Sequence, residues 1–340
     1  MINYNHLIDN INYVKNYTNK ELMIIVKNNA YNIGLENTVK HCIENGYRYF
    51  GVATIEEALQ VNSVSNEIFV LILNPLKKHE IEEAKKYNFT ISIPSYEWYQ
   101  QHHEYLGNLN LHIKLNVGMN RFGFSDMNLV NELLNTNKNI TGLYTHFPVA
   151  DEDDLSIHNS QVDKFVSMFE KVENKQQLEL IHSENSPTLL YKDERLSFCN
   201  IVRSGLISYG YTPSYPIPEL KATIYISKNI FYICDVKAGQ YVGYGLDNYF
   251  DYDTRIAVCP IGYGDGIARD RKCLPVYIDN KPFKVVAISM SHMLIEVDDT
   301  IKVDDEVEIF GDNAKIDLMI GKSEISPAEQ MTMLQMWRLK

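Results

Sequence analysis

The stretch "LMIIVKNNAYNIG", from Leu22 to Gly34, places an apolar run directly before a lysine, two asparagines and a tyrosine. The run has the aliphatic composition and the length of a strand in the interior of a parallel sheet. A lysine at the end of a buried strand, here Lys27, is energetically unfavourable unless it is paired, hydrogen-bonded or chemically used. The stretch therefore predicts a buried strand whose carboxyl end carries a candidate functional group.

Seven more apolar runs follow this strand, and amphipathic stretches separate them. The runs are "YFGVA" (49–53), "IFVLIL" (68–73), "FTISI" (89–93), "LHIKL" (111–115), "TGLYT" (141–145), "LELIH" (178–182) and "NIVRSGLISYG" (200–210). Stretches between them, such as 54–64 and 160–174, repeat apolar residues at the i, i+3, i+4 spacing of helices packed on one side. This alternation predicts parallel strands joined by crossover helices, and eight such units favour a (β/α)8 barrel over an open sheet.

The composition of the chain changes after about Lys221. From there, short β-rich runs such as "RIAVCPIGYG" (255–264) alternate with turn residues roughly every 8–12 positions, and helical periodicity is weak. The segment "TPSYPIPELK" (212–221) holds three prolines and is the natural linker. We therefore expect two domains, a barrel over residues 1–220 and a mostly β domain over residues 221–340.

Composition and charge exclude several classes of protein. The chain has 340 residues, of which 45% are hydrophobic and 22% charged, so it can bury real cores. Its net charge is −12 and its basic residues are scattered, which argues against a nucleic-acid partner. The longest apolar runs are far too short to span a membrane, and Met1 to Asn10 lack the order of a signal peptide. We expect a cytoplasmic protein with neither a nucleic-acid nor a membrane partner.

Motifs for metals, disulfides and other common chemistries are weak or missing. The five cysteines are widely spaced and form no CxxC pair, so they indicate reduced thiols. "QQHHEY" (100–105) is typical of a surface, and "DEDD" (151–154) lacks the glycine and the final glutamate of a calcium loop. "GYGDG" (262–266) lacks the order of a nucleotide-binding turn, and the chain has no GxSxG elbow. We expect no bound metal.

Polar residues stand where the predicted barrel strands end. The residues are Lys27 with Tyr31 beyond it, Lys114 with Arg121 beyond it, His146, His182 with Asn185 and Ser186 beyond it, and Arg203 with Gly205. Each has an ordinary structural role open to it: a lysine can extend to solvent, a histidine can be a hydrogen-bonded core residue, and an arginine can be an ion-pair partner. Because the carboxyl ends of barrel strands form one face, the set together predicts a single site that binds an anion or a ring.

Seven separated motifs, in this order, resemble the alanine racemase family, which comprises fold type III pyridoxal phosphate (PLP) enzymes with a (β/α)8 barrel and a C-terminal β domain. The motifs are "VKNNAY" (26–31), "KLNVGMNRFGF" (114–124), "GLYTHFPVADEDD" (142–154), "HSENS" (182–186), "VRSGLISYG" (202–210), "IGYGDGIAR" (261–269) and "SMSHMLIEVD" (289–298). The resemblance covers most of the chain. It implies an amino acid racemase that interconverts L-alanine and D-alanine, for D-alanine biosynthesis.

The resemblance assigns a cofactor role to residues of the barrel. Lys27 is expected to form the Schiff base with PLP and to act as a base on one face of the substrate Cα, because nearby cations and burial lower the pKa of such an amine. Arg203 is expected to face the pyridine nitrogen, supported by His182, and its charge should keep that nitrogen unprotonated. The residues expected at the cofactor phosphate are Tyr31, Ser186, Gly205 and Leu206.

The resemblance also implies a homodimer with composite active sites. Tyr263 of the partner subunit is expected to be the second base, on the opposite face of Cα, and His146 is expected to hydrogen-bond this tyrosine beside the cofactor. Arg121 is expected to bind the substrate carboxylate, with help from the backbone N–H of the partner's Met290. Lys114 matches a lysine that is carbamylated in many members, where the added anion positions the arginine.

Two departures from the family pattern lie in the predicted β domain. Ser289-Met290-Ser291 stands where members usually carry Cys-Met-Asp, and no tyrosine follows Tyr277, so the late tyrosine at the cofactor phosphate is missing. Its absence should remove one hydrogen bond, about 1 kcal/mol, and widen the entrance. A racemase of serine or of a broader amino acid range is therefore an alternative. Two further alternatives are a PLP-dependent decarboxylase, which usually needs a late cysteine motif, and a non-catalytic PLP-binding homeostasis or regulatory protein, which lacks the β domain.

Overall fold

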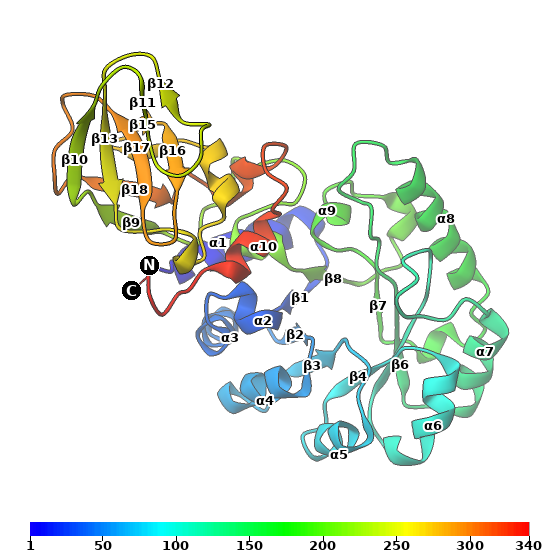
Figure 1. Ribbon diagram of the computed structural model, residues 1–340. Helices are drawn as coiled ribbons and strands as arrows, with labels where there is room; N and C mark the ends of the chain where they lie inside the picture. The colour runs from blue at the N-terminus through cyan, green and yellow to red at the C-terminus, as the bar shows by residue number, and fades with distance from the viewer. Residues whose placement is uncertain (340) are drawn as a thin grey trace. The chain divides into compact units, whose positions relative to one another are not determined.

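The computed structural model describes residues 1–339, which form two compact units. One unit holds Ile11–Ala30 and Gly34–Ser208, and the other holds Met1–Asn10, Tyr31–Ile33 and the chain from Tyr209 onward. The first is a (β/α)8 barrel and the second is mostly β (Figure 1), so the predicted fold class is confirmed. The predicted boundary after residue 220 stays a prediction.

The barrel sheet contains all eight predicted strands in parallel. They are β1 (Glu21–Ile25), β2 (Tyr49–Val52), β3 (Phe69–Ile72), β4 (Thr90–Ile93), β5 (Leu111–Lys114), β6 (Ile140–Tyr144), β7 (Leu180–His182) and β8 (Ile201–Ser204). β8 pairs with β1, and Met23 stands opposite Arg203. Backbone hydrogen bonds from Asn200 to Ile181 and from Arg203 to Glu184, both 3.1 Å long, link the last two strands. These links close the sheet into a barrel.

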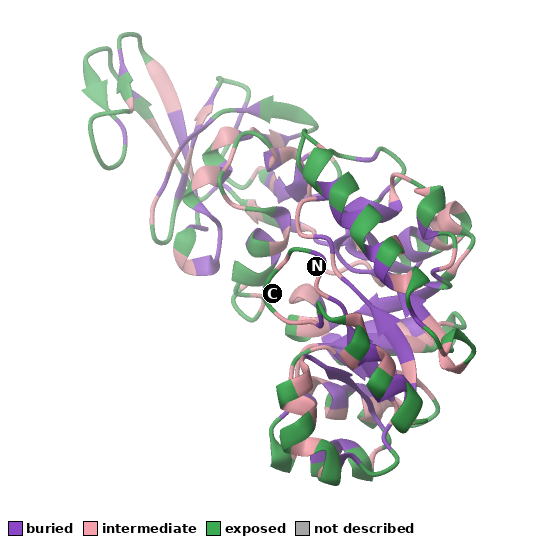
Figure 2. Cartoon of the chain, turned by 90° about the vertical axis from the view of Figure 1, so that its right-hand side faces the viewer, coloured by how far each residue is buried: buried purple, intermediate pink, exposed green. Residues whose placement is uncertain are grey.

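Helices cover the outside of this sheet because their apolar faces and those of the strands must be buried together. They are α1 (Tyr4–Thr18), α3 (Leu35–Glu44), α4 (Ile55–Val64), α5 (Lys78–Lys86), α6 (Tyr96–Leu106), α7 (Met127–Thr136), α8 (Ser156–Glu170) and the short α9 (Ser186–Leu189). Figure 2 shows buried barrel strands and helices whose outer faces are exposed. Thr54 begins α4 with a capping box, and Ser95 caps α6.

The second unit is built from short antiparallel strands. They are β9 (Ile226–Asn229), β10 (Tyr232–Val236), β11 (Gln240–Tyr241), β12 (Tyr249–Phe250), β13 (Thr254–Cys259), β14 (Val276–Ile278), β15 (Lys281–Phe283), β16 (Val285–Ile288), β17 (Met293–Val297) and β18 (Glu306–Phe310). One sheet has the order β10-β13-β17-β16 and another β15-β14-β18-β9, while β11 pairs with β12. The helix α10 (Pro327–Met333) follows near the end.

The five cysteines are free thiols, and three of them are fully buried. Among residues 1–339, no helix is both long and apolar enough to cross a membrane.

Candidate active site

Lys27 lies beyond the first barrel strand rather than within it. β1 ends at Ile25, and Lys27 begins the short turn α2 (Lys27–Tyr31). From Asn28 to Asn32 five consecutive residues have positive φ, between 50° and 74°, so the turn is left-handed. This conformation costs roughly 1–2 kcal/mol for residues such as Ala30, whereas asparagine adopts it more readily. The two asparagines after Lys27 are therefore explained by the backbone they must adopt.

Local hydrogen bonds hold this left-handed turn. The N–H of Ala30 donates to the carbonyl of Val26 at 2.9 Å, and the side-chain oxygen of Asn29 accepts from the N–H of Leu35 at 2.9 Å. The N–H of Asn28 donates to the carboxylate of Glu57, which also accepts the N–H groups of Ala53 and Thr54 just before α4. The amine of Lys27 is thus carried by a segment that is fixed at both ends.

Four cations gather at the barrel end where Lys27 lies. Burial, then Arg121 and Arg203, lower the pKa of Lys27, although Glu57 opposes the shift. Burial and the same two arginines lower the pKa of Lys114 to about 8. Among residues 1–339, no carboxylate forms an ion pair with any of these four side chains. A site with this much uncompensated positive charge is suited to an anion and favours a neutral lysine amine.

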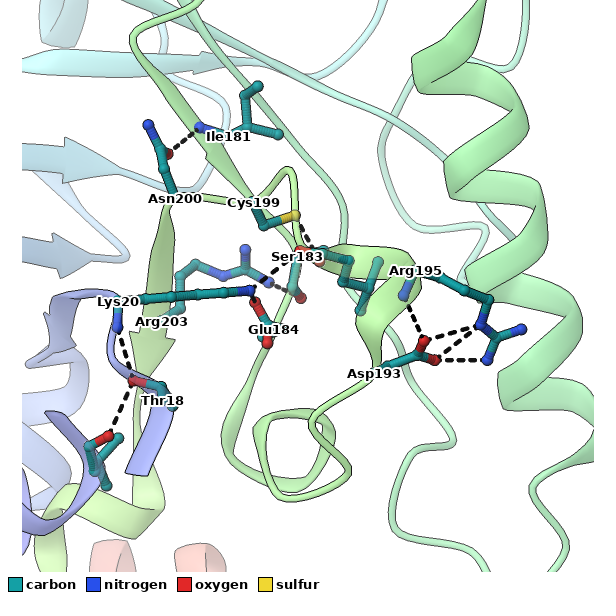
Figure 3. Close-up of polar contacts among 12 residues, drawn as sticks. Thr18, Lys20, Ile181, Ser183, Glu184, Asp193, Arg195, Cys199, Asn200 and Arg203 are labelled. Carbon is teal, nitrogen blue, oxygen red and sulfur yellow. Dashed lines mark hydrogen bonds and ion pairs between the residues drawn. The ribbon is translucent and has the colours of Figure 1, made fainter. Parts of the chain in front are cut away.

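Arg203 is buried on β8 and is held almost entirely by neutral acceptors. Its Nη1 donates to Nδ1 of His182 at 2.8 Å, and its Nη2 donates to the carbonyls of Thr145 at 2.7 Å and Ser183 at 3.0 Å. Figure 3 shows the guanidinium beside Ser183. Nη2 also lies 3.3 Å from Nδ1 of His146. Among residues 1–339, the hydrogen bonds of Arg203 all use Nη1 and Nη2, so its Nε–H is free to donate to a further acceptor.

The carboxylate nearest in sequence to this network is engaged elsewhere. Glu184 is buried and pairs with Lys20 at 2.7 Å (Figure 3). Burial raises the pKa of Glu184, and Lys20 offsets part of that shift. The charge of Arg203 is therefore not cancelled by a direct partner, and burial lowers its pKa only to about 10, so it stays cationic near neutral pH.

His146 and His182 are neutral near pH 7. Burial and then Arg203 hold the pKa of each well below its ordinary value. Because a guanidinium only donates, Nδ1 of His182 must accept, and its proton must lie on Nε2. Neither histidine is available as a cationic ligand for an anion, so that task falls to the lysines and arginines.

Three of the four residues expected at a phosphate lie close together, namely Ser186, Gly205 and Leu206. Ser186 is the first residue of α9, and its hydroxyl accepts from the N–H of Ile207 at 3.3 Å. Gly205 and Leu206 precede Ile207 and open a 3-10 helix (Leu206–Tyr209), whose first N–H groups have no partner within that helix. A hydroxyl and a helix start are thus side by side, a donor set that matches an anion.

Tyr31 belongs to the second unit, as does Tyr209, and their ring centroids are 4.7 Å apart. Burial raises the pKa of Tyr31 to about 12. Its phenol therefore stays protonated and can donate a hydrogen bond. Its expected role at the phosphate stays a prediction.

Arg121 is exposed on a loop after β5 that Asn116 organises. The side-chain oxygen of Asn116 accepts the N–H groups of Gly118 and Asn120, both at 3.1 Å. Gly123, with φ of 126°, closes the loop and leaves no room for a side chain, since a Cβ would lie 2.7 Å from the backbone of Asn116. Arg121 itself lines a groove of about 460 Å³.

The Gly123→Ala variant is expected to unfold at lower temperature than a matched control. The added methyl group must displace backbone in a left-handed region, which should cost about 2–4 kcal/mol. Gly46 also has positive φ, but nothing lies within 4 Å of a Cβ there, so Gly46→Ala should cost only about 1 kcal/mol. Thermal unfolding of both variants measures the difference. Equal losses would contradict the steric role of Gly123.

Tyr263 and Met290 are brought together on the second unit. The N–H of Tyr263 donates to the carbonyl of Ser289 at 2.9 Å, and that of Gly264 donates to the carbonyl of Met290 at 2.8 Å. Both side chains are exposed, Tyr263 to 38% and Met290 to 59%. The guanidinium of Arg269 lies 5.1 Å from the Tyr263 ring centroid. Two of the predicted site residues therefore form one exposed surface feature.

Three side chains inside the barrel were missed by the sequence reasoning. Tyr144 stacks on His182 with centroids 4.7 Å apart and shares a 2.6 Å hydrogen bond with Ser92. His112 lies 3.0 Å from His182. The sequence signal that could have found His112 was the period-2 alternation of strands. On one strand it puts His112 and Lys114 on the same face, and on the next strand it puts Gly142 and Tyr144 on the same face.

Comparisons with known proteins agree over the whole chain. The family described as alanine racemase, N-terminal domain, matches residues 2–213, and the alanine racemase, C-terminal domain, matches residues 223–339. A Staphylococcus aureus protein named alanine racemase 2 is 30% identical over 100% of this chain and 96% of its own length. The structure of alanine racemase from Acinetobacter baumannii is 27% identical with a TM-score of 0.85, covering 98% of this chain and 96% of that one. The alanine racemase structure from Oenococcus oeni is 26% identical, with a TM-score of 0.83 and coverage of 100% and 96%.

Proposed function

Because this chain belongs to the alanine racemase family and is an amino acid racemase, we propose that it interconverts L-alanine and D-alanine with PLP as its cofactor. The observation that carries the proposal is the cluster of Lys27, Lys114, Arg121 and Arg203, none of which forms an ion pair with a carboxylate among residues 1–339. A substrate carboxylate bound by Arg121 would supply part of the missing negative charge. The cytoplasmic location and the role in D-alanine biosynthesis remain predictions.

The residues of the barrel fit PLP. Lys27 would hold it covalently through an amine whose pKa is lowered by burial and by Arg121. Ser186 and the N–H groups at Gly205 and Leu206, with the phenol of Tyr31, would bind its phosphate. The unpartnered Nε–H of Arg203 would donate to its ring nitrogen, which must then be an unprotonated acceptor. When bound, PLP withdraws electrons from the substrate Cα and makes its proton acidic.

The chain's own residues would then bind the substrate and move one proton. Arg121 would bind the carboxylate of the amino acid, with the backbone N–H of the partner's Met290. The neutral amine of Lys27 would take or return the Cα proton on one face. Arg203 stays charged and would thereby keep the ring nitrogen unprotonated, which would weaken the ring as an electron sink and disfavour side reactions such as transamination.

A second base is needed on the opposite face of Cα, and we assign it to Tyr263 of the partner subunit. Support comes from the exposure of Tyr263 and Met290, which their backbone hydrogen bonds hold together on one unit. His146 would hydrogen-bond the phenol as a neutral ring. The proposal makes the homodimer the active species, with two composite sites.

Lys114 is proposed to carry a carbamate. Its amine is buried, its pKa is about 8, and it has no ion-pair partner among the described residues, so a sizeable neutral fraction exists near neutral pH. The carbamate would place an anion between Lys114 and Arg121 and so orient the guanidinium. Mass spectrometry of the intact native chain, in buffers with and without bicarbonate, tests this assignment.

The experiment that tests the proposed function is an exchange assay on the full chain with added PLP. Each standard amino acid is incubated in heavy water, loss of the Cα–H signal is followed by NMR, and the enantiomers are separated by chiral chromatography. Exchange with inversion, strongest for alanine, supports the proposal. Faster inversion of serine or of larger amino acids would show that alanine is not the preferred substrate, as the missing late tyrosine would allow. No exchange on any amino acid would overturn the proposal.

The pH dependence of cofactor capture should report Lys27 directly. Covalent capture needs the neutral amine, so the capture rate rises with pH through the pKa of Lys27, below the ordinary lysine value. Glu57 raises this pKa, so in Glu57→Gln the rise should move to lower pH, because removing a nearby negative charge disfavours the protonated amine. The one oxygen of glutamine can keep the hydrogen bonds from Ala53 and Thr54, whereas its amide nitrogen cannot accept the N–H of Asn28. Stopped-flow absorbance measures the rate, and Glu56→Gln, on the exposed side of the same helix turn, is the control. A shift to higher pH would contradict the assignment.

A further inference from the structure

His112 reaches across one strand to contact another. It lies on β5, opposite Gly142 on β6, while its partner His182 lies on β7. Nδ1 of His112 is 3.0 Å from Nε2 of His182. A Cβ on Gly142 would overlap Cδ2 of His112, and its three nearest atoms would all belong to that imidazole. The imidazole therefore crosses β6 at the position where glycine leaves space, and any larger residue would block it.

The direction of this hydrogen bond follows from its neighbours. Arg203 can only donate to Nδ1 of His182, so the proton of His182 lies on Nε2 and must be donated to His112. Nδ1 of His112 is then the acceptor, and the proton of His112 lies on Nε2. The hydrogen bonds therefore form one chain in which Arg203 donates to His182 and His182 donates to His112.

A histidine with only a packing role would not be expected to leave a buried ring nitrogen without a hydrogen-bond partner. His112 is fully buried, and its Nε2 has no hydrogen-bond partner among the described residues. An unsatisfied buried N–H typically costs about 1–3 kcal/mol. Burial lowers the pKa of His112 to about 3, so the ring stays neutral and keeps an acceptor. A side chain that is unfavourable for stability, placed where it accepts from a site residue, indicates a positioning role.

We propose that His112 is a positioning residue that accepts a hydrogen bond from the Nε2–H of His182, fixes the orientation of the His182 ring, and thereby holds the guanidinium of Arg203 in place. An acceptor at Nε2 also makes Nδ1 of His182 a better acceptor for Arg203. Gly142 is part of the same arrangement because its missing side chain leaves the space that the imidazole of His112 occupies. The significance for catalysis rests on the proposed function, whereas the hydrogen-bond chain itself does not.

The test uses the full chain with added PLP and histidine labelled with ¹⁵N in the ring. In the unsubstituted protein, His112 and His182 should both carry their proton on Nε2. His112→Leu removes the acceptor, so the Nε2–H signal of His182 should move upfield. His112→Asn places an oxygen near the former Nδ1 position, so it should retain the signal of His182. The same variants are assayed for racemisation and for the fraction of turnovers lost to transamination.

His112→Leu should lower kcat on the order of tenfold, the size typical of losing an outer hydrogen-bond partner, with little change in KM and a larger transaminated fraction. His112→Asn should stay within about threefold of the unsubstituted enzyme. Gly142→Ala should reproduce the His112→Leu effects, and it should have little effect in a His112→Ala background, where no imidazole remains to be displaced.

The outcomes separate the two proposals. Unchanged His182 signals in His112→Leu, or a proton on Nδ1 of His112, would overturn the positioning role. Equal effects of Gly142→Ala in both backgrounds would also overturn it. If the NMR result is as expected but no amino acid is racemised by the unsubstituted protein, the hydrogen-bond chain stands and the proposed function falls.

Discussion

Replacing Lys27 with alanine is expected to lower the racemisation of alanine by about 10⁴-fold or more, the range expected when a proton-transferring base that also anchors the cofactor is lost. The left-handed turn that carries Lys27 is held by backbone and asparagine contacts, so the barrel should remain folded. Circular dichroism and thermal unfolding check the fold, and chiral chromatography measures the rate.

Two controls make this prediction sharp. Lys27→Arg keeps the positive charge but cannot supply a neutral amine near neutral pH, so it should be as inactive as Lys27→Ala. Lys15→Ala removes a half-buried lysine that is paired with Glu21, and it should leave the rate unchanged. If Lys27→Ala kept a tenth or more of the activity, Lys27 could not be the base.

Replacing Tyr263 with phenylalanine is expected to lower racemisation in both directions by about 10²–10⁴-fold, the usual contribution of one acid–base group. The two directions must fall together because the equilibrium between enantiomers is unchanged. In heavy water, however, one enantiomer should still exchange its Cα proton without inversion, because Lys27 still acts on one face. Similar exchange of both enantiomers would exclude Tyr263 as the base of the opposite face.

Mixing the two inactive variants tests the composite site. If Tyr263 acts across the dimer, a dimer of Lys27→Ala and Tyr263→Phe chains contains one complete site. After random exchange of subunits, about half of the dimers are mixed and each has one of two sites, so activity should return to roughly a quarter of the unsubstituted value. No recovery after proven subunit exchange would place Tyr263 and Lys27 of one chain in the same site.

The sequence predicted the strands well because each buried strand reads as an apolar run of the right length. Strand ends then predicted Lys27, Lys114, His182 and Arg203, since a polar side chain that follows such a run is costly to bury unless it binds something. The position of Lys27 was less accurate: it follows β1 in a left-handed turn, and no periodic pattern signals a run of positive φ. The paired asparagines were the only trace of it.

His112 shows what sequence reasoning could not reach. Its position within "LHIKL" is that of any inward-facing residue of a strand. Its partner is two strands away, and the glycine that permits the contact lies on the strand between them. Such a contact depends on register across three strands, which local pattern does not determine.

The four cations at the end of the barrel, Lys27, Lys114, Arg121 and Arg203, affect the stability of the protein when no ligand is bound. Their mutual repulsion is present only in the folded chain, so it lowers the stability of the ligand-free protein. Any anion that binds there stabilises the fold by mass action, by about 2.7 kcal/mol at a hundred times its dissociation constant. The melting temperature of the ligand-free chain should therefore rise with inorganic phosphate more than with chloride at equal ionic strength. Because the same charges bind the ligands, the folding equilibrium of the chain depends on the concentration of those ligands.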